Sequence, residues 1–175
     1  RTEILNNISA ALLSLADAVR YLVLDKDLFH RKSEKLQLMK ILGEDPMTVT
    51  SKIEELFFGQ EVRQIVREAG AEIHSEKLHE SLFNFIWLTT RINDHHIHLL
   101  HRINESKTID WPEKCIAVSA LTLSLLEFFD QEKILLLIGF IESHEKQVYQ
   151  RALIGLIIAL LFYDQRIRFY PETVK

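Results

Sequence analysis

The sequence holds little of what a disulfide-stapled or β-rich protein requires. Its 175 residues include one cysteine, 5 glycines and 3 prolines. A lone cysteine excludes an intramolecular disulfide and fits a reducing compartment such as the cytoplasm. The scarcity of glycine and proline leaves too few tight turns for an all-β fold, and no segment alternates strictly between apolar and polar residues. We therefore predict an all-α protein.

Long hydrophobic runs are missing as well. The apolar stretches 115–126 and 152–163 each hold 12 residues without a formal charge, whereas a membrane-spanning helix needs about 20 apolar residues. We predict that both stretches are buried core helices and that the chain has no membrane span. We also expect no secretory signal peptide. Because the chain enters a helix directly after Arg1, we expect it to be one piece of a longer, cytoplasmic protein.

Charge of one sign is not concentrated anywhere in the sequence. The formal net charge is −4, and the densest basic group, His30-Arg31-Lys32, is followed closely by Glu34. Neutralising a phosphate backbone needs a concentrated basic surface. Dispersed charges of both signs are instead typical of solvated helix faces. The pattern therefore argues against nucleic acid as a partner.

The sequence does contain clear signals for where helices begin and end. Apolar residues recur at spacings of three and four over 3–24, which predicts the first helix. A second helix is expected after Asp27, ending near Gly43. Asp45-Pro46 is a helix start, because the carboxylate caps free amides and proline is tolerated in the first turn. The helix it opens is expected to reach Gly59 or to continue to Gly70.

The second half of the chain contains helix boundary signals of the same kind. Ser75 is expected to cap one helix, Asn93 or Asp94 to open a shorter one, and 104–110 to form the longest loop. Asp110-Trp111-Pro112-Glu113 is a further start signal, with an acidic cap, an early proline and a glutamate three residues after the cap. The remaining helices are expected over 110–129, 131–141 and 145–163. About nine helices are predicted in all.

The last part of the chain contains two segments that are similar to each other. Segments 94–130 and 130–164 each hold a short helix, a loop and a long apolar helix, with periods of 36 and 34 residues, the length of one helix–turn–helix unit. An apolar helix needs cover on several sides. We therefore predict that 115–129 and 145–163 are equivalent inner helices, each between neighbours, and that 1–91 is an irregular helical cap of the same single domain. Chance similarity between two apolar helices is the alternative.

The segment 144–156 resembles a known repeat. Four of its residues match the valine, alanine, small-residue and leucine positions in the second helix of a HEAT-type repeat: Val148, Ala152, Gly155 and Leu156. Tyr149 stands where that pattern has arginine. The region 111–171 is also similar to a segment of large uncharacterised bacterial proteins that carry tetratricopeptide repeats (TPR) elsewhere. These resemblances imply an α-α superhelical, HEAT-like array within a larger scaffold, and they imply no catalytic residue.

Three histidines come nearest to a ligand site. His95, His98 and His101 follow one another at steps of three, and neutral imidazoles are good ligands for zinc, copper or nickel. Successive steps of three drift around a helix instead of converging on one point, so we favour surface histidines on an outer helix. A metal- or small-ligand-binding helical bundle that uses 95–101 is the alternative function.

Other chemical signatures are weak. Glu76-x-x-His79 has the spacing of di-iron bundles, but its only approximate companion in the sequence is Asp27-x-x-His30, so chance placement is favoured. The sequence shows no Gly-x-Ser-x-Gly turn and no phosphate-binding glycine loop. Cys115 lies in an apolar run and is expected to be an inert core thiol. Trp87 and Trp111 are expected in the core or between helices, although exposed tryptophans often anchor interfaces.

These patterns together predict a non-enzymatic protein without cofactors. A stacked helical array offers a groove lined by one set of its helices. We therefore expect a protein–protein interaction scaffold within a larger intracellular protein. Its partner is expected to be another protein or other domains of the same chain.

Overall fold

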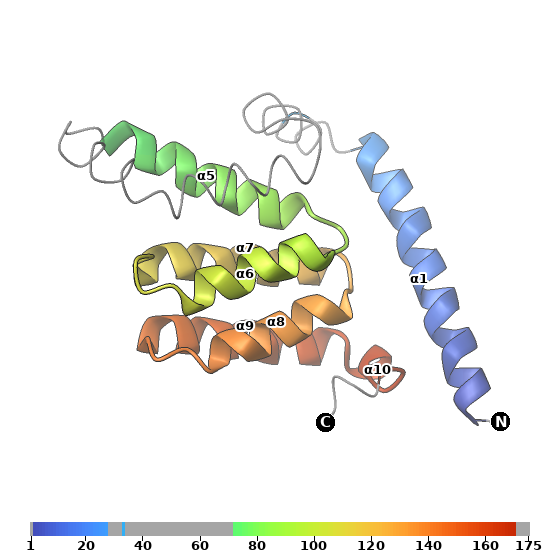
Figure 1. Ribbon diagram of the computed structural model, residues 1–175. Helices are drawn as coiled ribbons and strands as arrows, with labels where there is room; N and C mark the ends of the chain where they lie inside the picture. The colour runs from blue at the N-terminus through green and yellow to red at the C-terminus, as the bar shows by residue number, and fades with distance from the viewer. Residues whose placement is uncertain (1, 28–32, 34–71, 171–175) are drawn as a thin grey trace.

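A computed structural model of the chain describes residues 2–27, 33 and 72–170 (Figure 1). These residues form seven helices and no β-strand, which confirms the all-α prediction. α1 (Thr2–Asp27) corresponds to the first predicted helix. The second and third predicted helices lie outside the described residues. Among the helices described, none combines the length and the apolar character needed to cross a membrane.

Local capping explains where two helices of the second half begin. α6 (Asp94–Glu105) follows Asn93, whose side chain accepts a hydrogen bond from the backbone N of His96 at 3.1 Å. α7 (Trp111–Glu127) follows Asp110, whose backbone N donates to Glu113 Oε2 at 2.9 Å. Both contacts satisfy amides that a helix start leaves unpaired. These two predicted start signals are confirmed.

The other helices agree with their predicted ranges, with one exception. α8 (Gln131–Ile141) and α9 (Lys146–Phe162) lie within one residue of the predicted ends. α5 (Glu72–Leu88) begins earlier than predicted, so Ser75 lies inside the helix and is not its cap. No glycine or proline separates Glu72 from Ser75, and nothing in that turn therefore breaks the helix.

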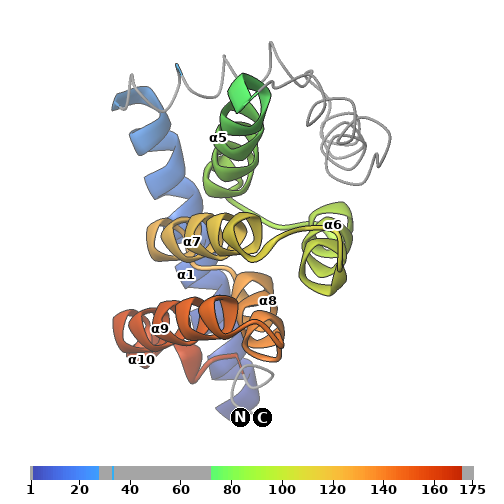
Figure 2. The same cartoon turned by 90° about the vertical axis from the view of Figure 1, so that its left-hand side faces the viewer.

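Helices α5 to α9 pack in two layers. α7 packs against both α5 and α9, while α6 packs against α8. Figure 2 shows α5, α7 and α9 on one side of the body and α6 and α8 on the other. α10 (Asp164–Ile167) is a single turn that packs against α9. It was not predicted, because four residues are too few to show a helical period.

The hydrophobic core lies between the two layers, and α7 is its most deeply buried helix. Side chains on most sides of α7 are buried, as expected for a helix with neighbours on both flanks. This confirms that the stretch 115–126 is a core helix. The fully buried aliphatic residues of α6, α7 and α8 include Leu99, Ile103, Val118, Leu121, Leu125, Ile134 and Leu137.

α9 is buried on one side only. Its buried residues are Val148, Ala152, Gly155 and Ala159. Its large exposed residues are Tyr149, Ile154, Ile157, Ile158, Leu161 and Phe162, with exposed fractions of 39–76%. The prediction that both long helices are sandwiched is therefore right for α7. It is wrong for α9 within the described residues, where α7, α8 and α10 leave the opposite side of the helix uncovered.

α1 stands beside the layered body rather than within it (Figure 1). No residue of α1 belongs to the hydrophobic core of the described chain. The contacts that join it to the body include an ion pair, in which Asp17 Oδ2 lies 2.7 Å from Arg166 Nη2, and the rings of Tyr21 and Phe128, which meet edge to face at 5.6 Å. The division of the chain into a cap and two repeats remains a prediction.

Candidate functional site

A groove runs between α7 and α9. Its volume is about 590 Å³, and no residue of α6 or α8 lines it. The lining is mostly apolar, with a few polar side chains at one end, which is the usual composition of a binding site. Its large apolar residues are Trp111, Leu123, Ile154 and Ile158, and its polar residues include Ser119, Gln147, Gln150 and Arg151.

The floor of the groove is a close crossing of the two helices. A Cβ atom placed on Gly155 would overlap Thr122 Oγ1 and lie 3.2 Å from Thr122 Cγ2. The hydroxyl of Thr122 is held in place, because it donates to the carbonyl oxygen of Val118 at 2.8 Å. Only glycine leaves room for this approach. Thr122 and Gly155 therefore set how closely α7 and α9 approach.

Polar contacts fix α7 against α9 at the amino-terminal end of the groove. Lys114 Nζ, whose side chain is only 5% exposed, lies 3.2 Å from Glu145 Oε1. Arg151 Nη1 donates to Ser119 Oγ at 2.7 Å. The Ser119 hydroxyl in turn donates to the carbonyl oxygen of Cys115 at 2.8 Å. The helices are therefore held in register where the polar lining residues lie.

A half-buried tyrosine, Tyr163, fixes the other end of the groove. The Tyr163 hydroxyl donates to the carbonyl oxygens of Leu125 at 2.8 Å and Leu126 at 3.2 Å. Burial raises the pKa of Tyr163 to about 12, and the charge of Asp17 adds to this shift while Arg166 and Arg20 oppose it. The hydroxyl therefore keeps its proton at neutral pH and remains a donor to the end of α7.

Arg151 is the only residue with a formal charge among those that line the groove. It also acts on Cys115, which is 4% exposed. Burial raises the pKa of the Cys115 thiol, Arg151 lowers it by a smaller amount, and Glu145 raises it. The thiol therefore stays protonated at neutral pH, and a protonated buried thiol is a poor nucleophile. The predicted core position of Cys115 is confirmed.

The two tryptophans have different positions. Trp87 packs against the core, with its ring 5.9 Å from that of Phe83, as predicted. Trp111 is 47% exposed at the start of α7 and lines the groove. Trp111 is therefore not a core residue, while its place in the groove between α7 and α9 agrees with the other predicted position, between helices.

The histidines of α6 do not form a ligand site in the described structure. His95, His98 and His101 are all exposed. No group of three or more histidine, cysteine, aspartate or glutamate side chains suited to a metal ion occurs among the described residues. Each step of three residues turns about 300° around the helix, which is about 60° short of a full turn. The three histidine side chains therefore diverge.

His96, the neighbour of these histidines, is buried and stacks on Phe85 with ring centroids 5.1 Å apart. Burial lowers the pKa of His96 to about 4, helped by the charges of His95 and Lys133 and opposed by Asp130. His96 is therefore neutral at physiological pH. It also completes the cap of α6, because its Nδ1 accepts from the backbone N of Asn93 at 3.3 Å.

Of the Glu76-x-x-His79 pair, the structure describes the side chain of His79. His79 Nε2 lies 3.5 Å from Glu113 Oε1 across α5 and α7, so the histidine faces a carboxylate of another helix. The side chain of Glu76 and the companion Asp27-x-x-His30 lie outside the residues whose side chains are described. The contact that is described joins two helices and has no third ligand.

Comparison of the chain with protein-family models, with curated proteins and with solved structures found no match.

The sequence did not predict which side of α9 is open. The size of the side chains in α9 could have indicated the open side. The buried residues of α9 recur at steps of four, three and four and are small: Val148, Ala152, Gly155 and Ala159. Small residues let two helix backbones approach, so this stripe identifies the packed side. The large aliphatic residues then lie on the opposite side of the helix. A prediction from hydrophobicity alone places these residues in a core, because it takes no account of side-chain size.

Proposed function

We propose that this chain is a HEAT-like helical-repeat module of a larger intracellular protein, and that it binds a protein segment without catalysing a reaction. The observation that carries the proposal is the continuous apolar surface formed by the α7/α9 groove and the open side of α9. Ile154 and Ile158 belong to both parts. Large exposed apolar patches on a folded protein are typical of interaction surfaces.

The packing of the two helix pairs supports the repeat interpretation. α7 and α9, the long helices of the two proposed units, lie side by side in one layer, and α6 and α8 lie side by side in the other (Figure 2). Phe129 and Tyr163 directly precede Asp130 and Asp164, the residues at which the proposed units end. Their rings meet edge to face at 5.0 Å, as equivalent residues of stacked units would.

The chemistry of the surface favours a protein over other ligands. The lining is apolar apart from two glutamines, two hydroxyl groups, the Cys115 thiol and the Arg151 guanidinium. One cation and a net charge of −4 are insufficient for a phosphate backbone. An amphipathic helix that places aliphatic side chains on Ile154 and Ile158 and a carboxylate near Arg151 fits this lining, because grooves of this kind bind the apolar face of a helix.

Selection from a displayed library of random peptides tests the proposal. The bait is the 175-residue chain, and the counter-selection uses its Ile154→Glu variant, which places a charge in the apolar lining. We expect enriched peptides to share spaced aliphatic residues and an acidic residue, and to bind the wild-type chain at least about tenfold more tightly than the variant.

A matched control is Glu142→Lys, a charge change at an exposed residue between α8 and α9 that lies outside the groove. This variant should bind the same peptides as the wild type. Enrichment of no common pattern, or peptides that bind Ile154→Glu and the wild type equally, would contradict the proposal.

A further inference from the structure

α1 carries a regular seam of aliphatic residues that the described body does not cover. Residues at alternating steps of three and four occupy the a and d positions of three consecutive heptads, the spacing of a coiled-coil strand. Each is 51–63% exposed. The a positions are Leu5, Leu12 and Val19, and the d positions are Ile8, Leu15 and Leu22.

The positions that flank this seam carry no charge from residue 4 to residue 23. In two-stranded coiled coils the flanking e and g positions usually hold charged residues that select the partner and its orientation. Without charges there, two identical helices meet without like-charge repulsion. The three alanines also allow the backbones to approach closely. The flanking residues are Ile4, Ser9, Ala11, Ala16, Ala18 and Val23.

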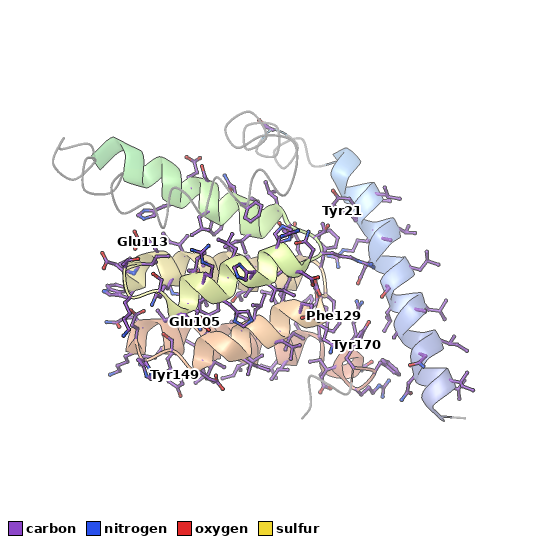
Figure 3. The ribbon with its side chains drawn as sticks, in the orientation of Figure 1. Tyr21, Glu105, Glu113, Phe129, Tyr149 and Tyr170 are labelled. Atoms are coloured by element: carbon purple, nitrogen blue, oxygen red, sulfur yellow. The ribbon has the colours of Figure 1, made fainter. Side chains whose placement is uncertain are left out.

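The opposite side of α1 faces the body. Tyr21 points toward the end of the body where Phe129 and Tyr170 lie (Figure 3), and its ring meets that of Phe128 at 5.6 Å. Asp17 pairs with Arg166 at 2.7 Å. Neither Asp17 nor Tyr21 occupies an a or d position. Leu22, at the end of the seam, also lines a pocket between α1 and the body. The rest of the seam stays accessible in the described part of the chain while α1 keeps its contacts with its own body.

We propose that the seam of α1 binds the same seam of a second copy of the chain, forming a two-stranded coiled coil with two-fold symmetry. Two such faces, each with more than half of every aliphatic side chain exposed, bring together roughly 1,500 Å² of surface, within the range of about 1,200–2,000 Å² of stable interfaces. A self-complementary patch of this kind is what a two-fold dimer requires. The inference is independent of the proposed peptide-binding groove, which lies on α7 and α9.

Sedimentation equilibrium of the full chain across the micromolar range tests this dimer. We expect the wild type to be dimeric. Leu12→Glu and, separately, Leu15→Glu should weaken dimerisation at least about 100-fold, because each places two carboxylates in the seam. Since α1 contributes nothing to the described core, both variants should keep the helical circular dichroism of the body. That measurement distinguishes lost pairing from lost folding.

Two controls separate this seam from other surfaces. Asn6→Glu places the same charge on the side of α1 away from the seam and should leave the dimer intact. Ile157→Glu places it on the open side of α9 and should also leave the dimer intact. A wild type that remains monomeric, a Leu12→Glu variant that dimerises like the wild type, or a dimer abolished only by Ile157→Glu overturns the proposal.

Discussion

Gly155 of α9 lies so close to Thr122 of α7 that a methyl group on the glycine would overlap the threonine side chain. This contact sets the distance between the two helices and therefore the width of the groove above them. Both residues are held from other directions as well. The hydroxyl of Thr122 is bound to the carbonyl oxygen of Val118, and Gly155 lies between Ala152 and Ala159, which are also buried.

Replacing Gly155 with alanine should destabilise the protein by about 1–3 kcal/mol, because the added methyl group forces the helices apart. Gly139→Ala is the matched control. A Cβ at Gly139 would lie 4.0 Å from His101 Cε1, which is ordinary contact, so this change should stabilise helix α8 by about 0.5–1 kcal/mol. Urea unfolding of the two variants measures both effects.

The double variant Gly155→Ala with Thr122→Ala tests the cause directly. Removing the threonine Oγ1 and Cγ2 atoms makes room for the new methyl group, so the double variant should recover a large part of the lost stability. If Gly155→Ala is as stable as Gly139→Ala, or if Thr122→Ala brings no recovery, the close crossing does not limit the packing of α7 on α9.

Lys133 is fully buried, and its amine donates three hydrogen bonds. Its Nζ donates to the carbonyl oxygens of Thr89 at 3.0 Å and Thr90 at 2.9 Å, and to Ser124 Oγ at 2.9 Å. It therefore satisfies the carbonyl groups of the two residues that follow α5. Lys133→Met should cost about 2–4 kcal/mol, because the part-buried Thr90 carbonyl loses the amine that donates to it and the Thr89 carbonyl keeps only the Ser124 hydroxyl as a donor.

The control for Lys133 is Lys107→Met in the exposed loop between α6 and α7. It should change the free energy of unfolding by less than about 0.5 kcal/mol. Thermal unfolding followed by circular dichroism compares the two variants. Equal stability of the two would show that the amine of Lys133 contributes no more than a solvated lysine.

His96 should make the fold sensitive to mild acid. Its pKa is lowered to about 4 in the folded chain, from an ordinary value of 6.5. Below pH 6.5 the unfolded chain therefore binds a proton that the folded chain does not. The stability associated with neutral His96 is fully present above pH 6.5 and is lost as the pH falls from 6.5 toward 4, by about 2 kcal/mol.

Urea unfolding of the wild type and of His96→Gln between pH 7 and pH 4 measures this effect. Glutamine keeps a side chain that can complete the α6 cap but does not titrate. The difference in stability between the two proteins should shrink or reverse as the pH falls, because only the wild type loses the contribution of His96. A difference that is constant over this range would show that His96 titrates normally in the folded state.

Zinc and nickel should have no effect on stability through the α6 histidines. His95, His98 and His101 are exposed, and no suitable metal-ligand group occurs among the described residues. A melting temperature that is unchanged by added zinc is the expected result. A rise that disappears in the His98→Ala variant would instead support the alternative function, a metal-binding bundle.

Much of the helical framework could be predicted from the sequence because its boundaries depend on local chemistry. Asn93, Asp110 with Glu113, and Asp130 each act within three or four residues, and the structure shows their capping contacts. Ser75 failed as a boundary signal because a serine can also be accommodated inside a helix, and the residues before it favour helix formation.

Features that depend on distant contacts could not be predicted in this way. Lys133 reads as an ordinary lysine in the first turn of α8, and its burial depends on carbonyl groups more than forty residues earlier. The position of Trp111 and the open side of α9 likewise depend on which neighbours each helix has. Hydrophobic periodicity identifies a helix but does not show how many other helices cover it.

The most direct test of binding through the α7/α9 groove is a methyl NMR titration of the chain with a peptide enriched in the display selection. We expect the methyl signals of Ile154, Ile158 and Leu123 to shift together and to saturate, while those of Ile134 and Leu137, which are fully buried in α8, stay in place. Shifts confined to α6 near His95 and His98, with the groove signals unmoved, would contradict the assignment of the groove as the binding surface.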